Sequence, residues 1–375
     1  MRRKLTVIAL QVLLLGAPMA MSQTAVPTRR DSALAQELGI DWSSSPVAAI
    51  QSAVFYNRVP SGVVKLNAKT GQQLWSFSPK RGWIGSNVVI LGPQVYFTRN
   101  ALSPCGPVYA LNSDSGRIAW SKEYSSCRIW SDGQHLYLQG SSGDGVRALD
   151  PVTGNLEWSA EDETPQFIDT LVALNGRVYT NDRILNSETG KTVFWWPKDA
   201  GITTLLASSG AVFTGTKKGS IIAYDAGTLK RKRQSSVLVN KNIESMMVVG
   251  KRIFAVAYAE EAKSARNGLL QAFDAETGNQ EWSLRITSCC RSLDAAPLGA
   301  APGLLMIILP TDKKSGSDLV AFDPATGRVL WSFTSSVTLQ GQPIAQGEHV
   351  YVVDAQDDLI ALNASTGKQA WMRKP

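Results

Sequence analysis

Short apolar runs separated by polar turns recur along most of the chain. Three of them read VAFDPATGRVLW, QAFDAETGNQEW and IALNASTGKQAW, and they end at Trp331, Trp282 and Trp371. In each, an apolar run leads into a turn, and the tryptophan stands four residues after the turn glycine. Short apolar runs bounded by turn residues predict β-strands joined as hairpins.

This turn occurs eight times. It begins at an Asn or Asp, namely Asn67, Asn112, Asp150, Asn186, Asp225, Asp274, Asp323 and Asn363. A Ser or Thr follows three residues later, and then a glycine, at Gly71, Gly116, Gly154, Gly190, Gly278, Gly327 and Gly367, with Leu229 in the fifth copy. The tryptophan completes six copies, at Trp75, Trp120, Trp158, Trp282, Trp331 and Trp371, whereas Phe194 and Arg233 replace it in the other two.

The spacing has a physical reason. An Asn or Asp side chain accepts the backbone N–H two residues on, and glycine adopts the left-handed conformation that ends a type I turn with a bulge. Upstream of each turn stands another apolar pair, such as Val95-Tyr96 or Val350-Tyr351, preceded by a further short strand. Each unit therefore predicts four antiparallel strands, A to D, with the tryptophan on strand D.

Eight units of about 42 residues fill residues 44–375. A four-stranded sheet of this length does not bury both faces alone, but sheets arranged radially bury one another. The sequence therefore predicts an all-β, eight-bladed β-propeller of four-stranded antiparallel blades, in which each indole fills the gap between two blades. The eighth unit has its own strand D, so ring closure requires no strand from the N-terminus.

Residues 1–43 precede the predicted propeller. Arg2-Arg3-Lys4, the apolar run 5–15 and the small residues near Ser22 are typical of a cleaved signal peptide, residues 1–22. An uncleaved membrane anchor is the alternative, although the run is short for a bilayer span. No later stretch has spanning length, so we expect a periplasmic or secreted protein. In the N-terminal segment 23–43, residues 31–39 predict a short helix that plugs or flanks the disc.

The charge argues against one class of partner. Removal of the signal peptide lowers the 38 basic residues to 35, against 31 acidic ones, which leaves a net charge of +4. Such a mild excess argues against nucleic acid binding.

The pattern A-[LF]-[DN]-x-x-[TS]-G-x-x-x-W, present as YALNSDSGRIAW and VAFDPATGRVLW, resembles the repeats of pyrroloquinoline-quinone-type propellers. The resemblance extends from about residue 44 to the end. It implies one of two functions. Quinoprotein alcohol dehydrogenases hold the quinone and a calcium ion on the propeller axis, whereas the BamB-like scaffold of the outer-membrane β-barrel assembly machinery is non-catalytic. The compact blades are closer to the scaffold, but its lipid-bearing cysteine is missing.

The resemblance implies a cofactor site where a strand D leads into the next strand A. The residues there are Cys289, Cys290 and Arg291, then Arg128 and Trp130, and finally Arg81 and Trp83. The adjacent cysteines are similar to the vicinal disulfide that covers the quinone in the dehydrogenases, arginine suits its carboxylates, and tryptophan suits its plane. Against a dehydrogenase, the sequence has no long insertion, no Cys-x-x-Cys-His and no acidic cluster for calcium. No catalytic or metal-ligating residue is predicted.

The other two cysteines fall on one face of the predicted disc. Cys105 lies in the B–C loop of blade 2, and Cys127 lies in the connection into blade 3. A disulfide between them fits an oxidising compartment. The other two pairings of the four cysteines stay open.

The two histidines share one position in the repeat. His135 and His349 precede strand B of their blades, where other blades carry Gln94 or Arg177. A position that accepts Gln or Arg predicts a solvated turn rather than a metal or acid–base site.

Three further features predict surfaces. The B–C loops 100–107, 260–268 and 311–317 are long, and loops on a rigid scaffold often carry recognition. Free variation of loop length is the alternative. Lys230-Arg231-Lys232-Arg233, with Lys217-Lys218 upstream, either protects the outer edge of blade 5 or binds an anionic surface. Trp195-Trp196 predicts a one-residue shift of the docking indole in blade 4, with one ring exposed.

The sequence thus favours an exported, non-catalytic propeller that binds protein or envelope partners without a cofactor. The alternative is a small quinoprotein, a sensor or a dehydrogenase, that binds pyrroloquinoline quinone with calcium.

Overall fold

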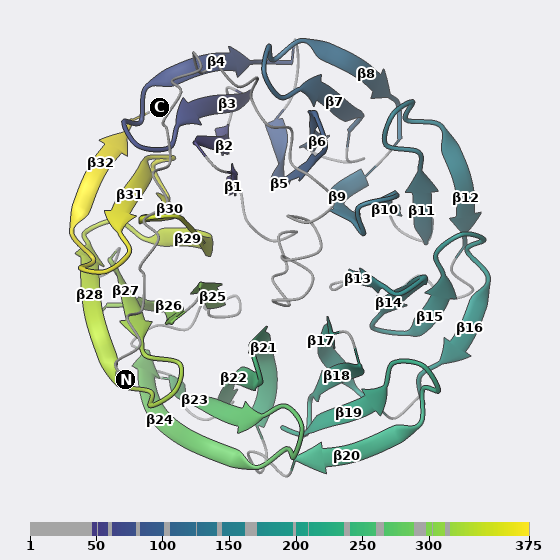
Figure 1. The fold of residues 1–375 in the computed structure, drawn as a ribbon, viewed down its shortest axis with the longest axis vertical. Helices are drawn as coiled ribbons and strands as arrows, with labels where there is room; N and C mark the ends of the chain where they lie inside the picture. The colour runs from purple at the N-terminus through teal and green to yellow at the C-terminus, as the bar shows by residue number, and fades with distance from the viewer. Residues whose placement is uncertain are drawn as a thin grey trace, which may run out of the picture.

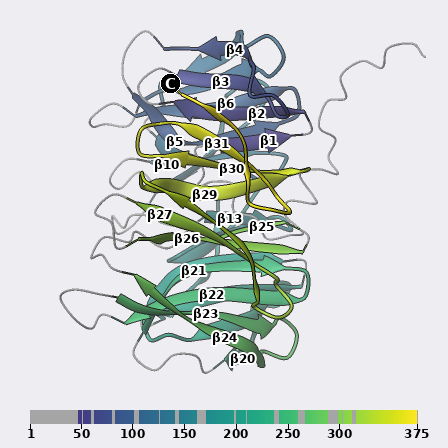
Figure 2. The ribbon, with the colours of Figure 1, turned by 90° about the vertical axis from the view of Figure 1, so that its left-hand side faces the viewer.

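The computed structural model describes residues 47–374, apart from 51, 59–61, 80–82, 101–105, 125, 141–144, 162–170, 198–199, 209, 236–240, 260–265, 289–297, 302 and 312–315. The described residues form eight four-stranded sheets around a common axis, as Figure 1 shows. Figure 2 shows the same disc from its edge. The predicted eight-bladed propeller is confirmed. The predicted signal peptide and the helix at 31–39 lie outside the described residues, and among the described ones no helix is long and apolar enough to span a bilayer.

The strands of the first four blades are β1 (Val47–Ile50), β2 (Ala53–Arg58), β3 (Gly62–Asn67) and β4 (Gln73–Phe77); β5 (Trp83–Leu91), β6 (Gln94–Asn100), β7 (Val108–Asn112) and β8 (Ile118–Lys122); β9 (Ser126–Ser131), β10 (Leu136–Gly140), β11 (Val146–Leu149) and β12 (Leu156–Ala160); and β13 (Leu171–Leu174), β14 (Arg177–Thr180), β15 (Arg183–Asn186) and β16 (Thr192–Trp195). The strands of the last four are β17 (Ile202–Ser208), β18 (Ala211–Thr216), β19 (Ile221–Asp225) and β20 (Arg231–Ser235); β21 (Lys241–Val249), β22 (Arg252–Ala259), β23 (Arg266–Asp274) and β24 (Gln280–Ser288); β25 (Leu298–Ala301), β26 (Leu304–Pro310), β27 (Ser317–Phe322) and β28 (Val329–Ser335); and β29 (Leu339–Gln346), β30 (His349–Asp354), β31 (Leu359–Asn363) and β32 (Gln369–Arg373).

Each blade pairs its strands in chain order, with the first strand near the axis and the fourth on the rim (Figure 1). The last blade is built from β29 to β32 and the first from β1 to β4. Among the described residues, the ring therefore closes by packing between complete sheets. Because strands alternate in direction, the A–B and C–D turns share one face of the disc, and the B–C and D–A connections share the other.

The repeated turn folds as predicted. In blade 1, Asn67 Oδ1 accepts the N–H groups of Lys69 and Thr70, both at 3.0 Å, and Gly71 N–H donates to the Asn67 carbonyl at 2.9 Å. Gly71 has a φ of +69°. The register between strands C and D shifts beside this turn in every blade, which is the expected bulge.

The core consists of slabs between blades rather than one central cluster. Each slab combines side chains of two neighbouring sheets, as where Phe55 and Val63 of blade 1 pack with Val88, Val95 and Phe97 of blade 2. The other junctions repeat this arrangement. A single blade therefore lacks a core of its own, and burial arises only when the blades stack sideways.

Six indoles fix these junctions. Trp120 Nε1 donates to the Pro151 carbonyl of the next blade at 2.9 Å, and its ring covers Gly154 so closely that a Cβ atom there would lie 2.6 Å from Cε3. The same arrangement joins Trp75 to Gly116, Trp158 to Gly190, Trp282 to Gly327, Trp331 to Gly367 and Trp371 to Gly71. The predicted packing role of the tryptophan is confirmed. The turn glycine has a second role that the sequence did not reveal, because it leaves room for the indole.

Two junctions depart from this rule. In blade 4 the buried ring is Trp196, 5% exposed, whereas Trp195 is 50% exposed. One exposed ring was predicted, but the shift is two residues from the Phe194 position rather than one. Trp196 donates to the Thr180 carbonyl of its own blade and lies 5.0 Å from Tyr224 of blade 5. In blade 5 the side chain of Arg233 takes the indole's place over Gly278.

Candidate functional site

Most of the predicted cofactor site falls outside the described residues. This holds for Arg81, Cys289, Cys290 and Arg291, and also for Cys105. The side chains of Trp83, at the start of β5, and Cys127, in β9, are not described either. The quinone site and the disulfide therefore stay predictions.

Strand β9 carries the two described members of that site. Trp130 is 5% exposed and packs between blades 3 and 4 beside Tyr137 and Leu171. Its indole nitrogen is buried and has no hydrogen-bond partner among the described residues. Arg128 is partly exposed and stands two residues earlier, on the same face of the strand. The innermost strand of blade 3 thus presents one face with an indole and a guanidinium.

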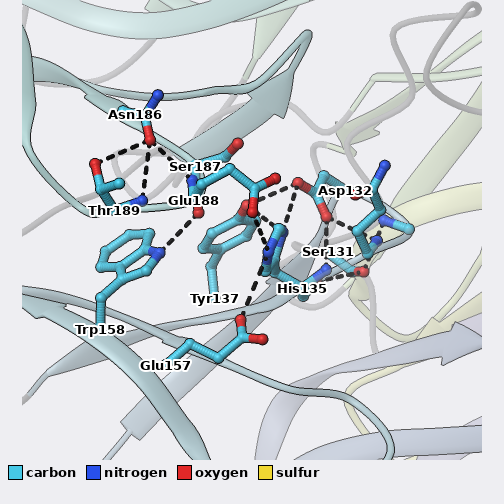
Figure 3. Close-up of polar contacts among 12 residues, drawn as sticks. Ser131, Asp132, His135, Tyr137, Glu157, Trp158, Asn186, Ser187, Glu188 and Thr189 are labelled. Atoms are coloured by element: carbon cyan, nitrogen blue, oxygen red, sulfur yellow. Dashed lines mark hydrogen bonds and ion pairs between the residues drawn. The ribbon is translucent and has the colours of Figure 1, made fainter.

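A polar cluster lies at the junction of blades 3 and 4, on the face of the A–B and C–D turns (Figure 3). Asp132 organises it, because its Oδ1 accepts the N–H groups of Gln134 and His135, both at 2.8 Å. Its Oδ2 accepts the Tyr137 hydroxyl at 2.7 Å and lies 3.2 Å from His135 Nδ1. These contacts fix the orientation of the imidazole.

The other imidazole nitrogen faces two carboxylates from different blades. His135 Nε2 lies 3.5 Å from Glu157 Oε2 of β12 and 3.8 Å from Glu188 Oε2, which belongs to the C–D turn of blade 4 (Figure 3). The His135 residue is 7% exposed. The prediction of a solvated turn is therefore wrong at this position, because the side chain points toward the next blade instead of into water.

The prediction of a solvated turn is also wrong for Arg177 in blade 4. Its guanidinium donates to the Ala226 carbonyl and, at 2.9 Å, to the Gly227 carbonyl of blade 5. Ala226 follows the turn aspartate, so its carbonyl is the one that an indole binds at the other junctions. The sequence carried a signal for this role, because Arg177 stands in the blade where Phe194 replaces the tryptophan.

The cluster at the junction of blades 3 and 4 contains acids and a base, and its electrostatics favour hydrogen bonding. Burial is the main cause that raises the pKa of Glu157, while His135 opposes the shift. Burial, and then Asp132, raise the pKa of Tyr137, so its hydroxyl stays protonated and donates. Among the described residues, no group of three or more His, Cys, Asp or Glu is arranged to hold a metal ion. The geometry therefore suits a polar bridge between blades.

The aspartates of the repeated turn predict that the fold loses stability in acid. Hydrogen bonds within the turn lower the pKa of Asp150, first from the Thr153 hydroxyl, and the pKa values of Asp225, Asp274 and Asp323, first from backbone N–H groups. A carboxyl group whose pKa is lower in the folded than in the unfolded protein stabilises the fold above about pH 3.9. This contribution is lost as the pH falls further.

We expect a variant with Asp→Asn at all four of these turns to lose less thermal stability than the wild type between about pH 5 and pH 2.5. Asparagine already occupies the same turn position in blades 1, 2, 4 and 8, so the substitution fits the turn. Thermal unfolding followed by circular dichroism across this range measures the effect. An identical acid dependence in the two proteins contradicts it.

Two family models match the chain. The model described as outer membrane protein assembly factor BamB matches residues 60–193 and 267–375, which is more than half of the chain. The model of the glucose/ethanol/alcohol dehydrogenase β-propeller domain matches residues 130–297. The fold and its repeats define a PQQ-type β-propeller. Within that class, the chain belongs to the family of the outer membrane protein assembly factor BamB.

Curated relatives include quinoproteins. The dehydrogenase subunit of the quinone alcohol dehydrogenase from Gluconobacter oxydans (strain 621H) is 22% identical over 304 residues, which cover 73% of this chain and 36% of that protein. The quinoprotein ethanol dehydrogenase from Pseudomonas putida is 31% identical over 126 residues, which cover 26% of this chain and 19% of that protein. The chain thus spans about a third and about a fifth of their lengths.

The same fold is found in a solved structure of a designed protein. The computationally designed Ika8 protein has a TM-score of 0.66 at 14% identity, with 88% of this chain and 99% of that one covered. A likeness at this identity shows the fold alone. The predicted resemblance is confirmed: the chain is a PQQ-like propeller related to BamB and to quinoprotein dehydrogenases.

Proposed function

We propose that the protein is an exported, non-catalytic scaffold that binds protein partners in the cell envelope. The extent of the family match carries this proposal, because the BamB model includes residues of blades 1 to 4 and of blades 6 to 8. The dehydrogenase model covers a shorter, central range.

The B–C loops supply the contact surface in this proposal. In the structure, β6 includes residue 100, β23 begins at Arg266 and β27 begins at Ser317, so the connections are shorter than predicted: residues 101–107, 260–265 and 311–316. They join β6 to β7, β22 to β23 and β26 to β27, and the strand ends that flank them lie on the same face of the disc. The opposite face carries the turns that fix one blade to the next, including His135 and Arg177. A partner on the B–C face therefore leaves the junction contacts undisturbed.

Cross-linking in envelope extracts of the source organism, followed by mass spectrometry and reconstitution with the purified partner, tests the proposal. We expect a variant with these three loops shortened to Gly-Ser turns to lose at least about tenfold in affinity for that partner. The control variant Lys69→Gln, Arg117→Gln and Lys368→Gln changes exposed turn residues on the other face and should bind normally. Equal binding by both variants, or no partner with the wild type, contradicts the proposal.

A quinone-binding function is the second candidate. The dehydrogenase model begins at Trp130, whose buried indole nitrogen lacks a partner among the described residues, and it extends past Cys289, Cys290 and Arg291. Incubation with pyrroloquinoline quinone and calcium should then shift the quinone absorption, and the double substitution Cys289→Ser with Cys290→Ser should abolish the shift. Dye reduction with an alcohol separates a dehydrogenase from a sensor. An unchanged spectrum rules out this candidate.

A further inference from the structure

Blade 5 differs from the other blades in its charge. From the start of β17 to the end of β20, the chain contains six Lys or Arg residues and a single acidic residue, Asp225. The basic residues are Lys217, Lys218, Lys230, Arg231, Lys232 and Arg233. Most of the modest positive charge of the protein is thus concentrated in one sheet.

The structure places these residues on the outside of the disc. Strand β20 is the rim strand of blade 5 (Figure 1); Arg231 and Lys232 are exposed along it, and Lys230 is exposed just before it. Lys217 and Lys218 are exposed in the turn between β18 and β19. Gln234 of β20 donates to Ser220 Oγ of that turn at 2.8 Å, so this turn contacts the end of β20, whereas Lys230 and Arg231 stand at the start of the strand.

Two of the six cations already have structural roles. Lys232 Nζ lies 2.9 Å from Asp225 Oδ2, and the side chain of Arg233 packs over Gly278 of blade 6. Arg231 donates to the neutral amide of Gln234, which leaves its charge uncompensated by that contact. Lys217 and Lys218 beside the end of β20, and Lys230 and Arg231 at its start, are therefore exposed cations along the rim of blade 5, which we term the blade 5 cations.

An apolar surface adjoins the blade 5 cations on the rim of blade 4. Val193 and Trp195 of β16 are 48% and 50% exposed. The residue after Trp195 packs 5.0 Å from Tyr224, and Tyr224 pairs with Arg231 across blade 5. Trp195 also has the Arg183 guanidinium 5.2 Å from its ring centre. The rim thus combines a large exposed indole with several exposed cations.

We propose that this rim of blades 4 and 5 binds the surface of a bilayer that contains anionic lipid headgroups. Basic side chains attract such a surface, and tryptophan favours the boundary between headgroups and acyl chains. Protection of an edge strand accounts for basic residues on β20, but not for Lys217-Lys218 outside that strand or for the exposed Trp195. A soluble acidic polysaccharide matches the cations alone and leaves the indole without a role.

The position of the site on the rim has a geometric consequence. A disc that contacts a membrane through its rim stands with its axis along the bilayer plane. The Lys217-Lys218 turn is the B–C turn of blade 5, but the long B–C loops belong to blades 2, 6 and 7, so they stay outside this contact. Membrane binding and partner binding are therefore compatible, and the proposal does not depend on which partner those loops bind.

Co-sedimentation of the full protein with phosphatidylcholine vesicles, with or without 30% phosphatidylglycerol, tests the proposal. We expect binding to the anionic vesicles that weakens as NaCl rises from about 0.05 to 0.5 M, and little binding to phosphatidylcholine alone. Each cation contributes about fivefold, so Gln at Lys217, Lys218, Lys230 and Arg231 should reduce partitioning on the order of 100-fold or more. Trp195→Ala should reduce it several-fold at both salt concentrations.

A matched control removes the same charge elsewhere. Gln at Lys69, Arg117, Lys368 and Arg373 changes exposed residues of blades 1, 2 and 8, and should reduce partitioning less than about threefold. Unchanged melting temperatures show that the variants are folded. Equal losses in the two quadruple variants indicate a net-charge effect and overturn the proposal. The proposal is also overturned if the wild-type protein does not bind anionic vesicles. The same holds if it binds dextran sulfate as tightly as the vesicles and Trp195→Ala does not change vesicle binding.

Discussion

Replacement of Trp371 by alanine is expected to lower the free energy of unfolding by about 3–5 kcal/mol. Trp371 closes the ring, because it reaches from β32 of blade 8 to the C–D turn of blade 1. Its Nε1 donates to the Ala68 carbonyl at 3.1 Å, and the Tyr351 hydroxyl donates to the same carbonyl at 3.1 Å. The indole also lies over Gly71. Urea denaturation measures the loss.

Trp195→Ala is the matched control for this experiment. It removes the same side chain from a rim strand, but the ring of Trp195 is half exposed and lies outside the junction core. We expect a change within about 0.5 kcal/mol. If the two alanine variants lose equal stability, docked indoles do not hold the ring together.

The fold was predictable because its signals are local. The turn needs an Asn or Asp, a hydroxyl and a glycine within five residues, and the tryptophan follows at a fixed distance. Such a short pattern can be recognised in each copy of the repeat, and the repetition itself predicts a ring of sheets. The number of blades followed from counting the turns.

The junction contacts were less predictable because they join residues that are far apart in the chain. His135 and Arg177 look like solvated turn residues when each blade is considered alone. Only the neighbouring blade shows that Glu188 and the Ala226 carbonyl lie opposite them. Which residue faces which turn depends on the angle between blades, and no local pattern encodes that angle.

One departure from the repeat in the sequence is related to the contact between blades 4 and 5. Leu229 replaces the turn glycine of blade 5, and it retains the left-handed conformation with a φ of +59°. The blade before it has Phe194 where the docking indole would stand. The single turn without glycine thus faces the position where blade 4 has no tryptophan, whereas blade 6 keeps Gly278 beneath the side chain of Arg233.

Gly367→Ala is expected to lower the free energy of unfolding by about 2–4 kcal/mol. Gly367 has a φ of +68°, which costs an alanine about 1–2 kcal/mol. A Cβ atom there would also lie 2.5 Å from Trp331 Cε3. The indole must then move away from the turn, which weakens its hydrogen bond to the Ala364 carbonyl, now 2.8 Å long. Urea denaturation again provides the measurement.

Substitutions at two other glycines distinguish the cost of backbone strain from the cost of the clash with the indole. Gly347 has a φ of +59° with nothing within 4 Å of an added Cβ, so Gly347→Ala should cost about 1–2 kcal/mol. Gly210 has the same open space without a positive φ, so Gly210→Ala should be neutral or slightly stabilising. A double substitution of Gly367→Ala with Trp331→Ala should cost less than the sum of the single losses, because the methyl group then occupies space that the indole has vacated. Strict additivity, or equal losses at Gly347 and Gly367, shows that conformation alone selects glycine at this turn.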